Sequence, residues 1–162
     1  MSLPRTLLSC AALTLFALGA GLPAIAADPH QGQHGTAVKP TKLVLNQGKK
    51  WATDEPLRKN MTAIRTALAA KHDAIEKGAL KPDEYQALGK LVEARVATIV
   101  AECKLAPAAD ANLHHIVADL IASADAMQGK SATKPAMGAA RTIRSLNTYG
   151  QYFDHPGWKP LG

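Results

Sequence analysis

The sequence predicts an all-α protein: an up-down-up-down four-helix bundle preceded by a cleaved signal peptide and a flexible N-terminal arm. From residue 53 onward, apolar residues recur at steps of three and four, as they do on the buried face of a helix. Alanine is frequent and runs of β-branched residues are short, which favours helices over strands. Proline and glycine divide this region into four segments with short links, and short links favour antiparallel neighbours.

Residues 1–26 have the pattern of an export signal. Arg5 precedes an apolar run over 7–22, Pro23 ends that run, and Ala24-Ile25-Ala26 is a small-x-small cleavage site. We expect cleavage after residue 26, a periplasmic location and no stable membrane insertion once the signal is removed. An uncleaved membrane anchor is the alternative.

The rest of the chain divides into three parts. Residues 27–52 are polar and contain several Gly, Gln and Lys residues, so we expect a flexible arm in which Leu43-Val44-Leu45 can dock on the domain. Residues 53–154 form the bundle and 155–162 a C-terminal tail. His30 and His34 lie in the arm, where they could capture a metal ion loosely.

Four helices are expected within the bundle. The first begins at residue 53 or 54 and ends before Gly78, and the second covers 81–103. The third begins near 108–110 and ends before Gly129, and the fourth runs from about 133 to 153. The inward positions predicted from the periodicity are Leu57, Met61, Ile64, Leu68, His72 and Ile75; Tyr85, Leu88, Val92, Val96, Ile99 and Cys103; Leu113, Ile116, Val117, Leu120, Ile121, Ala124 and Met127; and Met137, Ala140, Ile143, Leu146, Tyr152 and Phe153.

Charge and motifs exclude several classes of function. The formal net charge is +6, without a tight Lys/Arg cluster, so no nucleic-acid partner is expected. The sequence has no CxxCH, no HExxH, no glycine-rich phosphate loop and no nucleophile elbow. No acidic residues are paired for acid/base work, so we expect a protein that is not an enzyme.

The predicted topology brings potential metal ligands to one end of the bundle. These are Met61, Cys103, His114 and the trailing His155. Thioether, thiolate and imidazole groups select copper, above all Cu(I), or haem iron, so copper is the favoured ligand and haem the less expected one. A second and weaker candidate lies at the other end: His72, Met127 and Met137. The alternative for the methionines and for Cys103 is ordinary packing in the core.

The stretch ANLHHIVADL contains two adjacent histidines, which diverge by about 100° on a helix. His114 precedes Val117 by three residues, so we expect it to point inward or along a helix–helix seam. His115 aligns with Asp119, so we expect it in solvent, paired with that carboxylate.

Over residues 53–153 the chain resembles the small periplasmic b-type cytochromes and their four-helix-bundle relatives, the cytochrome c′ class. The resemblance rests on RKNMTAIR in the first helix and RTIRSLNTYGQYF in the last. It implies an exported haem-binding bundle with Met61 as one haem ligand. The family's second ligand is a histidine near the end of the last helix. Here that region reads Asn147 to Gly150, and His155 lies just beyond it.

These observations predict non-catalytic binding of a transition metal, with copper favoured, or of haem in the periplasm. The alternative is a metal-free interaction module of the cell envelope with an apolar core. In that alternative Trp51, Trp158 and the tail HPGWKPLG would dock an envelope protein.

Overall fold

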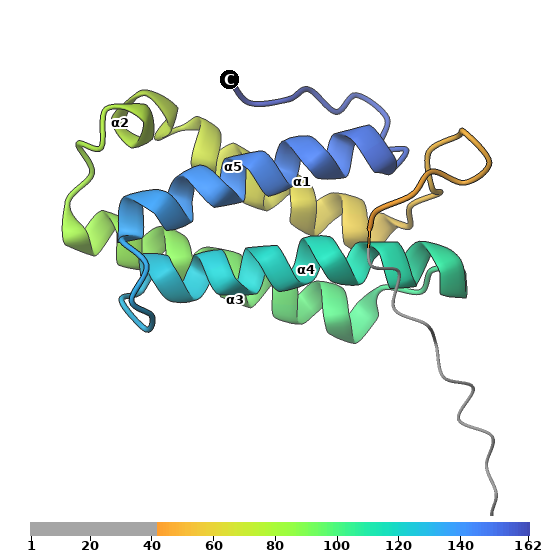
Figure 1. The fold of residues 1–162 in the computed structure, drawn as a ribbon, viewed down its shortest axis with the longest axis horizontal. Coiled ribbons are helices and arrows are strands. Elements are labelled where there is room, and N and C mark those ends of the chain that lie inside the picture. Colours follow the sequence, from red (N-terminus) through yellow and green to blue (C-terminus); the bar gives the residue numbers. More distant parts are fainter. Residues whose placement is uncertain (1–41) are drawn as a thin grey trace, which may run out of the picture. The chain divides into compact units, whose positions relative to one another are not determined.

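The computed structural model describes residues 42–162, and every regular element in this range is a helix (Figure 1). The predicted all-α class is therefore confirmed. The signal peptide and the arm up to residue 41, including His30 and His34, lie outside the described residues. The helices are α1 (Glu55–Ala69), α2 (His72–Glu76), α3 (Pro82–Glu102), α4 (Pro107–Met127) and α5 (Pro135–Tyr152).

Each of the four long helices begins with a proline in its first two positions. Proline suits this place because its fixed φ matches a helix and its missing N–H would have no partner there. At the start of α1, Asp54 also accepts a hydrogen bond from the backbone N–H of Leu57 at 2.9 Å. At the other ends, Gly78 and Gly129 have φ of +59° and +74°, the left-handed geometry that terminates a helix.

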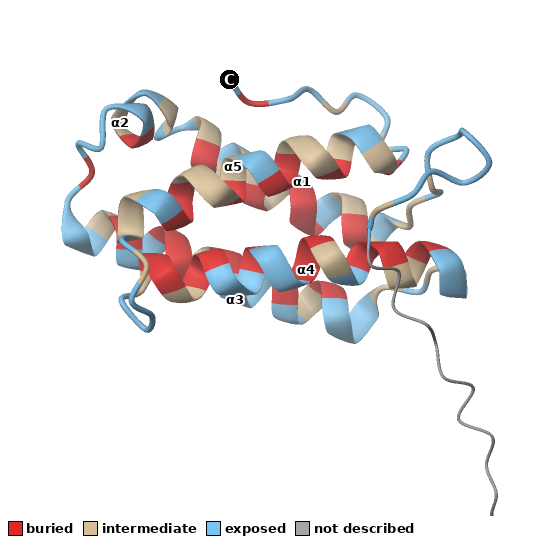
Figure 2. Cartoon of the chain, in the orientation of Figure 1, coloured by how far each residue is buried: buried red, intermediate tan, exposed pale blue. Residues whose placement is uncertain are grey.

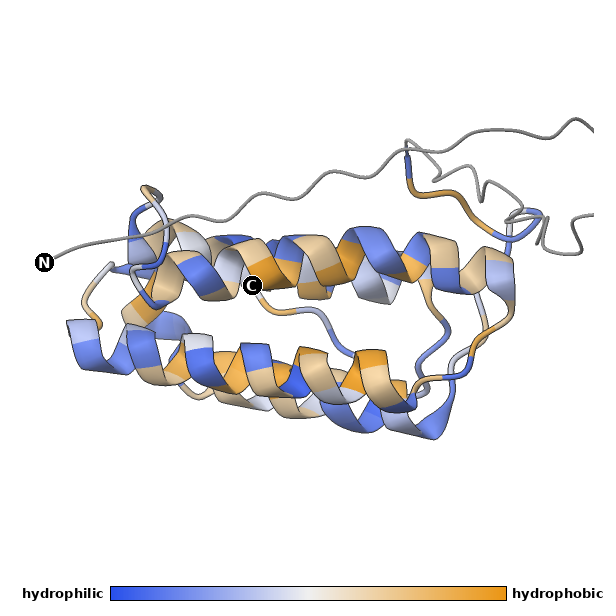
Figure 3. Cartoon of the chain, turned by 90° about the horizontal axis from the view of Figure 1, so that it is seen from below, coloured by the Kyte–Doolittle hydropathy of each residue, from blue (hydrophilic) through white to orange (hydrophobic). Residues whose placement is uncertain are grey.

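The four long helices lie side by side, and the sequence colours run in alternating directions along them (Figure 1). α3 packs against α1, α4 and α5, while α4 packs most extensively against α5. Buried residues line the inner sides of the helices (Figure 2), and apolar residues concentrate where the helices face one another (Figure 3). The centre of this core contains Leu57, Met61, Ile64, Leu68, Val92, Ile99, Ile116, Leu120, Met127, Leu146, Tyr149 and Phe153.

The expected first helix is two helices in the structure. α1 ends at Ala69, and the five-residue α2 begins at His72. At the junction the N–H of Lys71 donates to the carbonyl of Leu68, three residues back, which tightens the last turn. The interruption directs Ile75 into the core, with 5% of its surface exposed. No proline or glycine marks the break.

The buried face of α5 is only partly the predicted one: Leu146 is buried as expected, but the first half of the helix differs. Met137 is 57% exposed, whereas its neighbours Gly138 and Ala139 are buried. Thr142 is also buried, because its hydroxyl donates to the carbonyl of Gly138 four residues back and needs no other partner. Small residues therefore face α4, and the helices approach closely. Ile121 of α4, predicted to be inward, is 46% exposed.

Residues 42–52, expected to be the end of a flexible arm, form defined contacts with the helices. The N–H of Val44 donates to Oδ1 of Asn112 at 2.9 Å, and the indole N–H of Trp51 donates to the carbonyl of Val44 at 2.7 Å. Leu43 packs against the core, whereas Val44 and Leu45 remain exposed. Of the triplet Leu43-Val44-Leu45, only the side chain of Leu43 packs on the domain.

Candidate functional site

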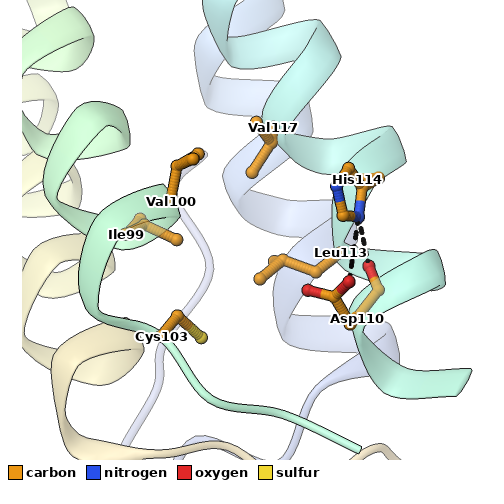
Figure 4. Close-up of a pocket in the computed structure, with 7 residues that line it drawn as sticks. All are labelled: Ile99, Val100, Cys103, Asp110, Leu113, His114 and Val117. Atoms are coloured by element: carbon orange, nitrogen blue, oxygen red, sulfur yellow. Dashed lines mark hydrogen bonds and ion pairs between the residues drawn. The ribbon is translucent and has the colours of Figure 1, made fainter. Parts of the chain in front are cut away.

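A pocket of about 70 Å³ lies between the end of α3 and the first turns of α4 (Figure 4). Its lining consists of four apolar side chains and three side chains with potential metal-donor atoms. The apolar ones are Ile99, Val100, Leu113 and Val117, and the others are Cys103, Asp110 and His114. In Figure 4 the sulfur of Cys103 points from the α3 side toward α4, and the carboxylate of Asp110 projects between Cys103 and His114. The pocket thus brings together two of the predicted ligands, Cys103 and His114.

Cys103 is held by Asp54, the residue that caps α1. The thiol donates to Oδ1 of Asp54 at 3.4 Å, and the N–H of Lys104 donates to Oδ2 of the same carboxylate at 2.6 Å. Burial of Asp54 alone would raise its pKa. The bonds from the N–H groups of Lys104 and Leu57 and from the thiol outweigh burial, so the net pKa of Asp54 is lowered.

The thiol of Cys103 is a poor acid in this environment. Burial raises its pKa to about 12, with further contributions from the hydrogen bond to Asp54 and from the charges of Asp54 and Asp110. At neutral pH the group is therefore a protonated thiol. The two carboxylates that disfavour a bare thiolate also make the surroundings of the sulfur attractive to a cation.

The imidazole of His114 has a defined tautomer. Its Nδ1 lies 2.8 Å from the backbone carbonyl oxygen of Asp110 and 3.4 Å from Oδ2 of the same residue. A carbonyl oxygen only accepts, so Nδ1 carries the proton and Nε2 of the neutral ring carries the lone pair. In Figure 4 this second nitrogen lies on the side of the ring toward α3. In histidine metal ligands, one ring nitrogen usually donates to a carbonyl or carboxylate, and the other ring nitrogen binds the metal.

The expectation for His115 is wrong, whereas His114 lies along a helix–helix seam, one of the two positions expected for it. The side chain of His114 is 65% exposed, at the rim of the pocket between α3 and α4. His115 is half-buried, and its Nε2 is buried without a hydrogen-bond partner. The reason is that α5 and residues 42–52 cover the side of α4 that carries Asn112, three residues before His115. The periodicity of α4 alone does not reveal which side its neighbours cover.

Met61 and His155 do not line this pocket. The side chain of Met61 is fully buried in the apolar core. The ring nitrogens of His155 lie 3.0 Å from the hydroxyl of Tyr149 and 3.3 Å from that of Thr62. Burial, with a contribution from the charge of Arg58, lowers the pKa of His155. A packed thioether and an imidazole bonded on both sides do not fit a haem between them.

The weaker candidate set is also dispersed. His72 begins α2, where its ring lies 3.8 Å from the exposed carboxylate of Glu76. Met127 belongs to the core with 1% of its surface exposed, whereas Met137 is 57% exposed, so the two thioethers do not share an environment.

Sequence reasoning missed the two carboxylates around Cys103. Asp110 precedes His114 by four residues, a spacing that signals contact on a helix. Asp54 is 49 residues from Cys103, and no local signal connects them. Within residues 42–162, no group of three or more His, Cys, Asp and Glu side chains is arranged to hold a metal ion. The donor set of the pocket is thus the Cys103–His114 pair with Asp110 beside it.

Comparison with known proteins finds no matching family model, no similar curated protein and no similar solved structure. Among residues 42–162, no helix has the length and apolar character required to cross a membrane.

Proposed function

We propose that this chain binds copper as Cu(I) at the pocket between α3 and α4, and that it does so without catalysing a reaction. The proposed ligands are Sγ of Cys103 and Nε2 of His114, with Asp110 orienting the imidazole. The supporting observation is that these two soft-to-borderline donors line one pocket although they come from different helices. The proposal includes a four-helix bundle of alternating direction, exported to the periplasm.

Electrostatics around the sulfur support a cation at this place. Binding replaces the S–H bond of Cys103 with an S–Cu bond and releases the proton to solvent. The positive ion then compensates the negative charges of Asp54 and Asp110, which disfavour the thiolate in the metal-free protein. Copper affinity should therefore increase with pH.

The small number of ligands is compatible with this ion. Cu(I) accepts a low coordination number, so a thiolate and an imidazole are sufficient. The walls made by Ile99, Leu113 and Val117 are apolar and shield one side of the pocket from water. The exposed side chain of His114 lies at the rim, which leaves an entry path for the ion.

The test is a Cu(I) titration of the mature chain against a competing chelator under reducing conditions. Cys103→Ser and His114→Gln should each lower the affinity at least about tenfold, equivalent to ~1.4 kcal/mol. Met61→Leu and His72→Gln are the controls and should leave the affinity unchanged. Copper should also raise the unfolding midpoint, because it binds only the folded state. An affinity that is unaffected by Cys103→Ser contradicts the proposal.

A second candidate is a metal-free interaction module of the cell envelope. It is favoured by two large apolar side chains that are exposed in the described part of α3 and α4: Val100 at 68% and Ile121 at 46%. Trp51 and Trp158, predicted to dock a partner, are instead half-buried against the domain. If the titration detects no binding of Cu(I) or Cu(II), this second candidate is preferred.

A further inference from the structure

The residues after α5 turn back along the domain (Figure 1) and form a strap, defined here as residues 156–162. Three residues of two helices contact it: the side chains of Arg65 in α1 and Asn147 in α5, and the backbone of Gly150 in α5. These three residues are the strap seat. It lies apart from the copper pocket, with which it shares no residue.

Most hydrogen bonds between seat and strap reach backbone atoms of the strap. The amide of Asn147 donates to the carbonyl of Leu161 at 2.6 Å and accepts from the N–H of the same residue at 2.8 Å. The guanidinium of Arg65 donates to the carbonyls of Lys159 and Pro160. Every extended peptide carries such groups, so these bonds do not depend on the sequence of the strap.

Two side chains of the strap supply the sequence-specific contacts. The indole of Trp158 lies against Gly150, where an added Cβ would be 2.4 Å from Cδ1 of the ring, so only glycine leaves room for it. The guanidinium of Arg65 lies 5.9 Å from the centre of the same ring. Leu161 is 8% exposed, and its side chain belongs to the apolar core. The anchors of the strap are therefore an aromatic residue and, three positions later, a leucine.

The strap fits its seat incompletely. Nε1 of Trp158 is buried without a hydrogen-bond acceptor, and this unmade bond weakens the intramolecular complex. The strap begins with Pro156 and Gly157, and Gly157 has a φ of +76° in a tight turn. A ligand with the same two anchors and an acceptor for the indole would compete with the strap.

We propose that the strap seat is a docking site for an extended peptide of Trp-x-Pro-Leu type supplied by another protein, and that residues 156–162 occupy it as an internal competitor. Main-chain hydrogen bonds provide affinity for the incoming segment, and the Trp and Leu anchors provide specificity. The strap thereby keeps the site closed until a better-fitting segment displaces it.

The test uses the full chain and a fluorescein-labelled peptide with the sequence DHPGWKPLG, followed by anisotropy. A variant with Trp158→Ala and Leu161→Ser loses its internal competitor, so it should bind the peptide at least tenfold more tightly than the unmodified chain does. Adding Asn147→Ala or Gly150→Ala to that variant should remove binding, as should replacing Trp by Ala in the peptide. Helical circular dichroism verifies that each variant is folded. If the double variant does not fold, Trp158→Ala alone replaces it.

Two results of the binding experiment would overturn the proposal, and a third would come from the oligomeric state. One is a folded strap variant that binds no peptide. The other is binding that persists after Gly150→Ala, since it would not depend on the seat. Dimerisation of the unmodified chain that is lost in the strap variant would also overturn it, because the occupant would then be the strap of a second copy. Cys103→Ser should leave peptide binding unchanged, so failure of the copper proposal is distinguishable from failure of this one.

Discussion

At the scale of single residues, Asp54 connects the fold with the candidate site. Its carboxylate accepts from the N–H of Leu57, which caps α1, and from the N–H of Lys104, which follows α3. The same oxygen that caps α1 accepts from the thiol of Cys103. One charge therefore fixes the relative position of two helix ends and suppresses ionisation of the cysteine.

Two substitutions separate these roles. Asp54→Asn keeps one capping oxygen but removes the charge and the acceptor for the N–H of Lys104, so it should lower the pKa of Cys103 from about 12 toward its ordinary value of 9.0 and cost about 0.5–1.5 kcal/mol of stability. Asp54→Ala removes the capping oxygen as well and should lower the free energy of unfolding by a further ~0.5–2 kcal/mol. The pH dependence of thiol alkylation and denaturant unfolding measure the two effects. Asp119→Asn, on the exposed side of α4, is the control; an unchanged thiol pKa in Asp54→Asn contradicts the assigned role.

His155 makes stability depend on pH. Its folded-state pKa lies below the ordinary 6.5, so below that pH the unfolded chain binds more protons than the folded one. This contribution to stability is fully present at neutral pH and is lost as the pH falls below about 6.5. Protonation would also convert the nitrogen near the Tyr149 hydroxyl into a donor.

The measurement is the unfolding midpoint of the chain and of His155→Gln between pH 7 and 5. The difference between the two should narrow on acidification, because only the unmodified chain loses the contribution of His155. His72→Gln controls for the removal of a histidine elsewhere. Parallel pH profiles for the chain and His155→Gln would show that His155 does not titrate across this range.

At the scale of helices, the close contact between α4 and α5 depends on the absence of a side chain at position 138. A Cβ on Gly138 would lie 2.7 Å from the carbonyl oxygen of Ser123 and 2.9 Å from Cβ of Ala126. Gly138→Ala should therefore destabilise the fold by about 1–3 kcal/mol, although alanine is the better helix former. Met137→Ala, one residue away on the exposed face, should change stability by less than about 0.5 kcal/mol. The denaturant unfolding midpoints of the two variants test this prediction. A larger loss of stability in Met137→Ala than in Gly138→Ala would contradict it and would favour the buried face expected from hydrophobicity.

The helices themselves were largely predictable, because the prolines and glycines that bound them act locally. Periodicity also identified the buried faces of α1 and α3, where large apolar residues mark the inside. On α5 it identified Leu146 but failed for Gly138, Ala139 and Thr142, which are buried because small residues permit close approach to α4. It also failed at the break between α1 and α2, which no residue type announces.

The candidate site was likewise predictable only in part. Helix directions were sufficient to group Cys103 with His114, and both line one pocket. They were not sufficient for Met61, since a position at the same height can face the core instead of the pocket. The positions of Asp54 and His155 depend on bonds between segments far apart in the chain, and local patterns do not encode such bonds.

At the scale of the whole molecule, hydrogen bonds join the residues just before α1 to the residues just after α5. The N–H of Trp51 donates to the carbonyl of Tyr152, and the N–H of Asp154 donates to the carbonyl of Trp51, both at 2.8 Å. The hydroxyl of Thr53 adds a bond to the carbonyl of Asp154 at 2.6 Å. These bonds attach the segment before α1 to the segment after α5. Stability is therefore expected to be high at this end and lower at the opposite one.

The opposite end contains α2, which is the place where the fold should open first. This helix has five residues, its N-cap makes no side-chain hydrogen bond, and among the other helices its substantial contacts are with α5. Ile75 is its single buried residue. Backbone amides of α2 should therefore exchange with deuterium much faster than those at the centres of α3 and α4, because local opening of α2 exposes little apolar surface.

Native-state hydrogen exchange measured by NMR or mass spectrometry tests this gradient. Ile75→Ala should accelerate exchange of residues 72–76 further, while protection at the centres of α3 and α4 should fall only by the global loss of stability. Ala94→Gly on the exposed side of α3 is the control, since it weakens a long helix without removing a core contact. Equal protection of α2 and α4 would mean that the short helix unfolds only with the whole domain. Its packing over the helix ends would then contribute far more stability than its one buried side chain indicates.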